Sequence, residues 1–164
     1  MRRRAFSLVA LLVLAAPGSA LAKGATVRLV LTCGGLAAPV VIADSARLTF
    51  ALGPWGGGFM DTTRSVRTAP TRPLRPCEVA FYVRYGPSDV QLAYVVYYYP
   101  RSRGRSGYVY LPGRGNPWYA LNAGTILRRG RDGHWMYASR AWEEGLIRPA
   151  LAEATGGARS GRGR

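Results

Sequence analysis

The segment from residue 78 to residue 99 restricts the fold more than any other part of the chain. Residues 78–85 (EVAFYVRY) and 90–99 (VQLAYVVYYY) are rich in the β-branched and aromatic residues that favour strands. Residues 86–89 (GPSD) between them have the composition of a tight turn. Both alternating sets of side chains in 90–99 are apolar or aromatic, which is typical of a strand covered on both faces. The sequence therefore predicts a β-hairpin at the centre of an antiparallel sheet.

Shorter strands are expected on both sides of this hairpin. The 21 glycines and 11 prolines of the chain favour turns and short strands over long helices. An Asp-Gly pair at positions 132–133 also favours a second hairpin around it. The segments predicted as further strands are 25–32 (ATVRLVLT), 38–43 (APVVIA), 46–52 (ARLTFAL), 108–111 (YVYL), 125–129 (TILRR) and 134–138 (HWMYA).

One helix is expected, near the C-terminus. Ser139 can cap its first turn, and Trp142, Leu146 and Ala150 recur on one helical stripe. Pro149 within this pattern would kink the helix or restart it. We therefore predict a mainly β (α+β) fold, in which one C-terminal helix packs on a small antiparallel sheet or open barrel.

The chain length of 164 residues suffices for one domain, which we place at residues 23–155. Within this domain, residues 53–76 include eight glycines and prolines and predict a long irregular loop. Loops of that length are usually functional or mobile. Residues 156–164 (GGARSGRGR) have almost no apolar side chains, so we expect a disordered basic tail.

Residues 1–22 have the composition of a secretory signal peptide. A basic start precedes an uncharged stretch at 5–16 (AFSLVALLVLAA), which is too short to span a bilayer. Residues 20–22 (ALA) match a small-x-small cleavage site, so we expect cleavage before Lys23, with an uncleaved N-terminal anchor as the alternative. The pair of arginines in 3–6 (RRAF) leaves general secretory and twin-arginine export both open. We expect a secreted, periplasmic or bacterial cell-envelope protein, with no transmembrane segment in the mature chain.

The two cysteines of the chain are Cys33 and Cys77. In an oxidising compartment an even pair of cysteines is typical of a structural disulfide. Such a bond would stabilise the fold by about 2–4 kcal/mol, mainly by restricting the unfolded chain. We therefore expect a Cys33–Cys77 disulfide.

The formal net charge of +15 has two explanations. Lys23 is the only lysine, so nearly all of the 23 basic residues are arginines, as a GC-rich coding sequence would give without selection for charge. The functional explanation is a surface that attracts polyanions, because the guanidinium group binds carboxylate and phosphate through two parallel hydrogen bonds. The sequence leaves both explanations open.

Few catalytic groups are available. His134 is the only histidine and no GxSxG motif accompanies it, so a serine-histidine triad is disfavoured. One histidine and two bonded cysteines cannot form a zinc site, and we expect no metal and no cofactor. Asp61 and Glu78 are the acids that turns and helix ends do not explain, and a glycosidase could use such a pair of carboxylates if they met. Asp61, Glu78 and His134 are thus weak catalytic candidates, and we favour a protein that is not an enzyme.

Tyrosines and arginines form the main candidate binding site. We select Tyr97, Tyr99 and Tyr108 as stacking platforms for sugar rings or bases, since they lie on neighbouring predicted strands. The alternative is that these rings pack within the sheet. The arginines expected beside them are Arg101, Arg103, Arg105 and Arg114.

These observations lead to one preferred function and two alternatives. We expect an exported, non-enzymatic protein that associates with anionic polymers, lipid headgroups or an acidic protein. The alternatives are a secreted glycan hydrolase and a structural subunit of an exported complex. No dedicated role in nucleic-acid binding is expected outside the cytoplasm.

Overall fold

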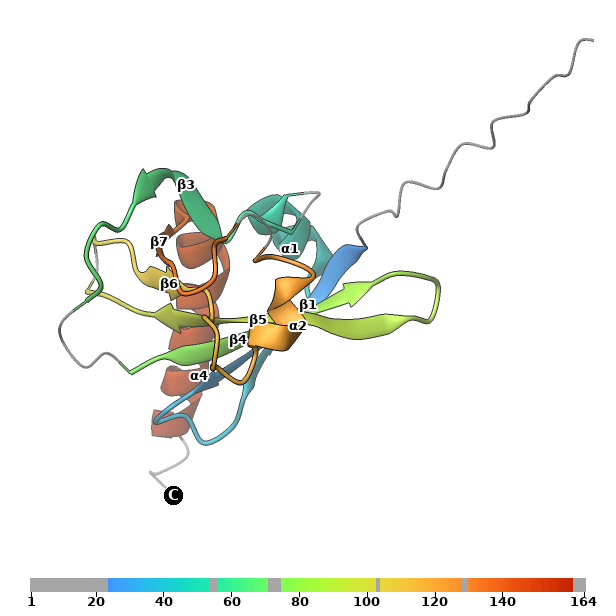
Figure 1. The fold of residues 1–164 in the computed structure, drawn as a ribbon. Coiled ribbons are helices and arrows are strands. Elements are labelled where there is room, and N and C mark those ends of the chain that lie inside the picture. The colour runs from blue at the N-terminus through green and yellow to red at the C-terminus, as the bar shows by residue number, and fades with distance from the viewer. Residues whose placement is uncertain (1–23, 54–55, 71–74, 103, 128–129, 161–164) are drawn as a thin grey trace, which may run out of the picture.

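The computed structural model describes residues 24–53, 56–70, 75–102, 104–127 and 130–160 (Figure 1). Seven antiparallel strands form one open sheet in the order β2-β1-β4-β5-β6-β7-β3. The predicted fold class is confirmed, since the chain is mainly β with a C-terminal helix and one disulfide. The elements are β1 (Ala25–Cys33), β2 (Val40–Ile42), α1 (Ser45–Leu52), β3 (Met60–Ser65), β4 (Cys77–Arg84), β5 (Val90–Tyr99), β6 (Tyr108–Tyr110), α2 (Tyr119–Ala123), β7 (Trp135–Ala138), α3 (Arg140–Trp142), the π-helical turn η1 (Glu143–Ile147) and α4 (Arg148–Ser160).

The predicted central hairpin is β4–β5. Phe81 lies opposite Tyr94, and a bulge follows between Phe81 and Tyr82. The two strands are flanked by β1 on one side and β6 on the other, so both are interior strands of the sheet. Val96 and Tyr98 are buried on the core side of β5, and Val95 is buried on its other face beside α2, so both faces of this strand carry apolar side chains.

One face of the sheet forms the hydrophobic core against α1 and the C-terminal helical segment, which lies behind the sheet in Figure 1. Phe59, which precedes β3, has no exposed surface, and its ring lies 5.2 Å from Phe81 and 6.2 Å from Trp142. The Trp142 ring also meets Tyr98 edge-on at 5.2 Å. Burying side chains of this size contributes about 1.5–3 kcal/mol each, so this cluster holds the C-terminal segment against the sheet.

The predicted strand at 46–52 is wrong, because these residues form α1. Asp44 caps the helix by accepting a 3.0 Å hydrogen bond from the Arg47 amide. Leu48, Ala51 and Leu52 are its buried residues, and their three- and four-residue spacing is that of a helix face. The short apolar segment fits a strand by composition, but the cap and this spacing favour the helix.

Two further predictions need correction. The segment 53–76 is not irregular throughout, because β3 lies within it and pairs with β7 at one edge of the sheet. Residues 125–127 are not in a strand, so β7 pairs instead with β6 and β3. The helix α2, which was not predicted, occupies part of the chain between β6 and β7.

The C-terminal helical segment begins as predicted, with the Ser139 hydroxyl accepting a 3.3 Å hydrogen bond from the Trp142 amide. Pro149 lacks an amide hydrogen and would crowd the carbonyl of Gly145 in an uninterrupted α-helix. Here the turn before Pro149 is the π-helical η1, and the Gly145 carbonyl accepts instead from Arg47 at 3.1 Å. The helix then continues to Ser160, past the predicted boundary at residue 155.

The disulfide joins Cys33 and Cys77, which lie directly opposite each other on β1 and β4. It therefore ties the end of the first strand to the start of the central hairpin. No helix in the described part of the chain is long and apolar enough to cross a membrane. The predicted signal peptide at 1–22 and its cleavage site lie outside the described residues.

Candidate binding site

Aromatic side chains cover the face of β5, β6 and β7 that is opposite the core. Alternation along each strand sends Tyr98 and Val109 into the core, while the residues on either side of them point to the other face. We call this surface the aromatic strip. It consists of Tyr97, Tyr99, Tyr108, Tyr110, Trp135 and Tyr137, all half-buried.

The strip has two rows that run across the strands. In one row Tyr97 lies opposite Tyr110, and Tyr110 lies opposite Trp135. In the other row Tyr99 lies opposite Tyr108, which in turn lies opposite Tyr137. Side chains directly opposite each other on neighbouring strands are close enough to pack. Contacts of Trp135 with Tyr99 and Tyr108 connect the two rows.

Trp135 is the centre of these contacts. Its ring lies 4.8 Å from the ring of Tyr99, 4.9 Å from Tyr110 and 6.2 Å from Tyr108. Aromatic pairs at such distances contribute about 0.5–1.5 kcal/mol each beyond the area they bury. The rings therefore hold one another in place.

The hydroxyls of Tyr97 and Tyr99 stay protonated at neutral pH. Burial raises the pKa of Tyr97, and the nearby Glu78 carboxylate and Tyr110 raise it further. Burial also raises the pKa of Tyr99, with smaller contributions from Tyr110 and Tyr97. Both hydroxyls can thus donate a hydrogen bond to a ligand.

Two arginines cover one end of the strip. The Arg101 guanidinium lies 4.7 Å from the ring centre of Tyr108, and the Arg64 guanidinium lies 4.7 Å from that of Tyr137. Ser106 connects them, since its hydroxyl accepts from Arg64 at 3.0 Å and its carbonyl accepts from Arg101 at 3.3 Å. The cation–π geometry holds both charged groups flat on the aromatic surface.

Arg64 is also paired with an acid. Its Nε lies 2.6 Å from a carboxylate oxygen of Asp61, which sits opposite Tyr137 on β3. Hydrogen bonds from the Thr63 hydroxyl, the Arg64 guanidinium and the Thr63 amide lower the pKa of Asp61 to about 2. The charge of Arg64 is therefore balanced, whereas Arg101 forms no ion pair within the described residues.

Glu78 lies at the opposite end of the strip. It sits opposite Tyr97 on β4 and accepts a 2.8 Å hydrogen bond from the indole Nε1–H of Trp118, the residue that precedes α2. The helix α2 is fixed beside β5 by Asn122, whose buried side chain bonds both the amide and the carbonyl of Val95. Register would place Pro112 opposite Val95, and because proline has no amide hydrogen the Asn122 side chain supplies the missing partner.

The structure does not bring Asp61 and Glu78 together. They lie on β3 and β4, and β5, β6 and β7 separate these strands. Four strand spacings of about 4.8 Å give a separation of about 19 Å. Paired carboxylates of glycosidases lie about 5–9.5 Å apart, so this arrangement does not supply such a pair.

The connection between β5 and β6 is held from the core side by a buried carboxylate. Glu143, which is 2% exposed, accepts hydrogen bonds from the Tyr98 hydroxyl at 2.6 Å and from the Gly107 amide at 3.0 Å. Arg148 lies 2.8 Å from the same carboxylate and donates a second bond to the carbonyl of Arg105. A buried charge is tolerated only when it is paired and hydrogen-bonded, as it is here. This network fixes the connection that carries Arg101 and Ser106.

The sequence-predicted residues are only partly brought together. Tyr97, Tyr99, Tyr108 and Arg101 lie at the strip. Arg105 is exposed on the connection, and Arg103 lies outside the described residues. Arg114 is exposed on the loop after β6, with its guanidinium 3.9 Å from Asp132.

His134 is exposed just before β7, where its ring Nδ1 lies 3.1 Å from the carbonyl oxygen of Asp132. Among the residues that the structure describes, no group of three or more His, Cys, Asp and Glu side chains could hold a metal ion.

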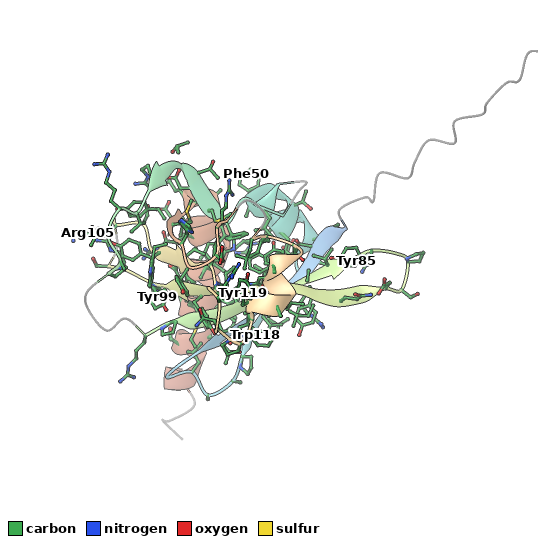
Figure 2. All side chains as sticks on the ribbon, in the orientation of Figure 1. Phe50, Tyr85, Tyr99, Arg105, Trp118 and Tyr119 are labelled. Carbon is green, nitrogen blue, oxygen red and sulfur yellow. A yellow bond between two sulfur atoms is a disulfide. The ribbon has the colours of Figure 1, made fainter. Side chains whose placement is uncertain are left out.

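Tyr110, Trp135, Tyr137 and Arg64 were not selected from the sequence. The two-residue spacing in 134–138 was a usable signal for Trp135 and Tyr137, because it places both on one face of a strand. No comparable sequence pattern pointed to Arg64, because its strand β3 lies within the segment that was predicted as a loop. Figure 2 labels Tyr99 and Trp118 on the sheet side of the molecule, with Tyr85 near the end of β4, where the β4–β5 hairpin extends away from the rest of the chain.

No family model, curated protein or solved structure matches this chain.

Proposed function

We propose that this chain is an exported, non-enzymatic protein of the cell envelope or extracellular space that binds an anionic polymer through the aromatic strip. The observation that carries the proposal is the Arg101 guanidinium, which lies over Tyr108 at the border of six rings connected by pairwise contacts. The Cys33–Cys77 disulfide and the signal-like residues 1–22 support the location outside the cytoplasm.

The strip and Arg101 supply complementary interactions. Half-buried aromatic rings present apolar faces on which flat parts of a polymer can stack. Arg101 lacks an ion-pair partner in the described part of the chain, so its charge is available to a carboxylate or phosphate on the ligand. The excess of basic over acidic residues in the chain favours encounter with any polyanion, and salt weakens that attraction.

The test is co-sedimentation of the purified protein with envelope fragments from the producing cell, across a salt series. We expect retention that falls with salt, and we expect Arg101→Ser to weaken it about tenfold, as for the loss of one charged hydrogen bond. Arg84→Ser is the matched control, because Arg84 is exposed at the end of β4 remote from β6 and β7. Equal retention of both variants would overturn the assignment to the strip.

Treating the fragments separates the other partners named above. Retention that survives lipid extraction and protease digestion of the fragments supports a polymer. Retention that disappears after either treatment assigns the protein to lipid headgroups or to an acidic protein, and overturns the polymer proposal.

A further inference from the structure

We infer that the polymer is a glycan with widely spaced acidic groups, lying across the strands along the two rows of the aromatic strip. This inference rests on the proposed function and specifies its ligand. Three features of the strip support it: the distribution of charge, the hydrogen-bonding groups at its two ends, and the spacing of the rings.

The charge distribution favours a ligand with few acidic groups. Carboxylates stand at both ends, Asp61 beside Tyr137 and Glu78 beside Tyr97. The low pKa of Asp61 keeps it ionised, and it balances Arg64 at 2.6 Å. A polymer with a negative charge on every unit would place charges against Glu78, while Arg101 offers one favourable site. A glycan with one acidic group in several units can match Arg101 and avoid Glu78.

Asp61 already accepts hydrogen bonds from Thr63 and Arg64, whereas Glu78 has room for further hydrogen-bond donors. An ionised carboxylate has acceptor sites only, and Trp118 fills one site on Glu78 at 2.8 Å. Sugar hydroxyls are donors and can fill the others. Polyphosphate has no donors at neutral pH, so it would repel Glu78 and leave its remaining acceptor sites unfilled. The Glu78 end of the strip is therefore suited to a hydroxyl-rich chain.

The spacing of the rings favours sugars over nucleic-acid bases as the ligand. Rings of the strip lie 4.8–6.3 Å from one another, in contact, so no slot remains between them for an inserted base. The rings of Tyr97, Tyr99, Tyr110 and Trp135 lie away from the two arginines that cover Tyr108 and Tyr137. Their faces and edges instead suit the apolar C–H faces of consecutive sugars. Glu78 begins the row of Tyr97, Tyr110 and Trp135, and Asp61 ends the row of Tyr99, Tyr108 and Tyr137. Both rows cross the strands, and this sets the direction of the bound chain.

The charge of Glu78 gives a test in which the two ligand types respond in opposite directions. Glu78→Gln removes a negative charge, so it should strengthen the binding of a densely charged polyanion. For a glycan, the same substitution replaces a charged carboxylate acceptor by a weaker amide acceptor. We therefore expect the affinity for the glycan to fall about threefold to tenfold. Asp89→Asn makes the same change in net charge at the exposed β4–β5 turn and is the control.

The probes are hyaluronan oligosaccharides, with one carboxylate per two sugars, and polyphosphate and oligothymidylate as dense polyanions. Affinity is measured by calorimetry, and the indole N–H signals in NMR spectra locate the site. We expect hyaluronan to bind most tightly and to shift the signals of Trp135 and Trp118 but not that of Trp142, which is fully buried.

Each result decides between the proposals. Hyaluronan binding that shifts the Trp135 signal and weakens in Glu78→Gln but not in Asp89→Asn supports the glycan. Tighter binding of a dense polyanion, strengthened in Glu78→Gln, overturns the glycan inference and leaves polymer binding intact. Absence of any shift in the Trp135 signal with every probe at low salt overturns both.

Discussion

The carboxylate of Glu143 lies 2.8 Å from the guanidinium of Arg148, five residues further along the chain. In a regular α-helix, residues three or four apart share a face, whereas a π-helical turn brings residues five apart into line. The turn η1 spans Glu143–Ile147, so it is this irregularity that forms the pair. The pair also holds the β5–β6 connection, which carries Arg101. The π-helical turn therefore helps to place Arg101 at the border of the aromatic strip.

Removing the charge of Glu143 should destabilise the fold. Glu143→Gln leaves Arg148 without its buried partner, and we expect the free energy of unfolding to fall by about 2–4 kcal/mol. Urea denaturation measures the change. Glu144→Gln is the matched control, because Glu144 is exposed and pairs with Arg140 only on the surface, where such pairs contribute about 0.3–0.5 kcal/mol. Similar losses for the two variants would contradict a structural role for the buried pair.

Gly107 should not tolerate a side chain. A Cβ at this position would lie 2.6 Å from the ring of Tyr98 and 2.8 Å from the carboxylate of Glu143. We expect Gly107→Ala to cost about 1–3 kcal/mol of stability, as for other overpacked sites. At Gly34 a Cβ would meet nothing within 4 Å, so Gly34→Ala is the control. A melting temperature for Gly107→Ala equal to that of the control would show that the connection is loosely held.

Asp61 should contribute stability that disappears in acid. Its pKa in the folded state is lowered from 3.8 to about 2, so the folded chain holds the charged form more strongly than the unfolded chain. The contribution is complete above pH 3.8 and is lost as the pH falls towards 2. Wild type should therefore be more stable than Asp61→Asn at pH 6, and the two stabilities should converge near pH 2. Denaturation at several pH values checks this, and a difference independent of pH would contradict it.

The disulfide should matter for stability. Replacing Cys33 and Cys77 together by serine should lower the free energy of unfolding by about 2–4 kcal/mol, because the bond restricts the unfolded chain. Chemical denaturation of wild type with and without reductant provides an independent measurement. If reduction leaves the denaturation midpoint unchanged, the bond adds nothing to the pairing of β1 with β4.

The parts of the structure that could be predicted from the sequence are those that residues close together in the chain determine. The β4–β5 hairpin and the Ser139 cap were predictable, since each depends on residues close together in the chain. The segment 46–52 was not, because a short apolar run fits either secondary structure until Asp44 is seen to cap it. The aromatic strip was predicted only in part: Tyr99 and Tyr108 are near neighbours in sequence, whereas Arg64 reaches Tyr137 through pairing of β3 with β7. That pairing is set by tertiary packing, and local composition does not encode it.

Ser106 and Gly107 are consecutive residues that make contacts on opposite faces of the sheet. Ser106 binds Arg64 and Arg101 over the rings, and the Gly107 amide binds Glu143 in the core. An amide proton exchanges with solvent only when its hydrogen bond opens. The exchange rate of this one proton therefore reports how often the connection detaches, and it can be followed before any ligand is known.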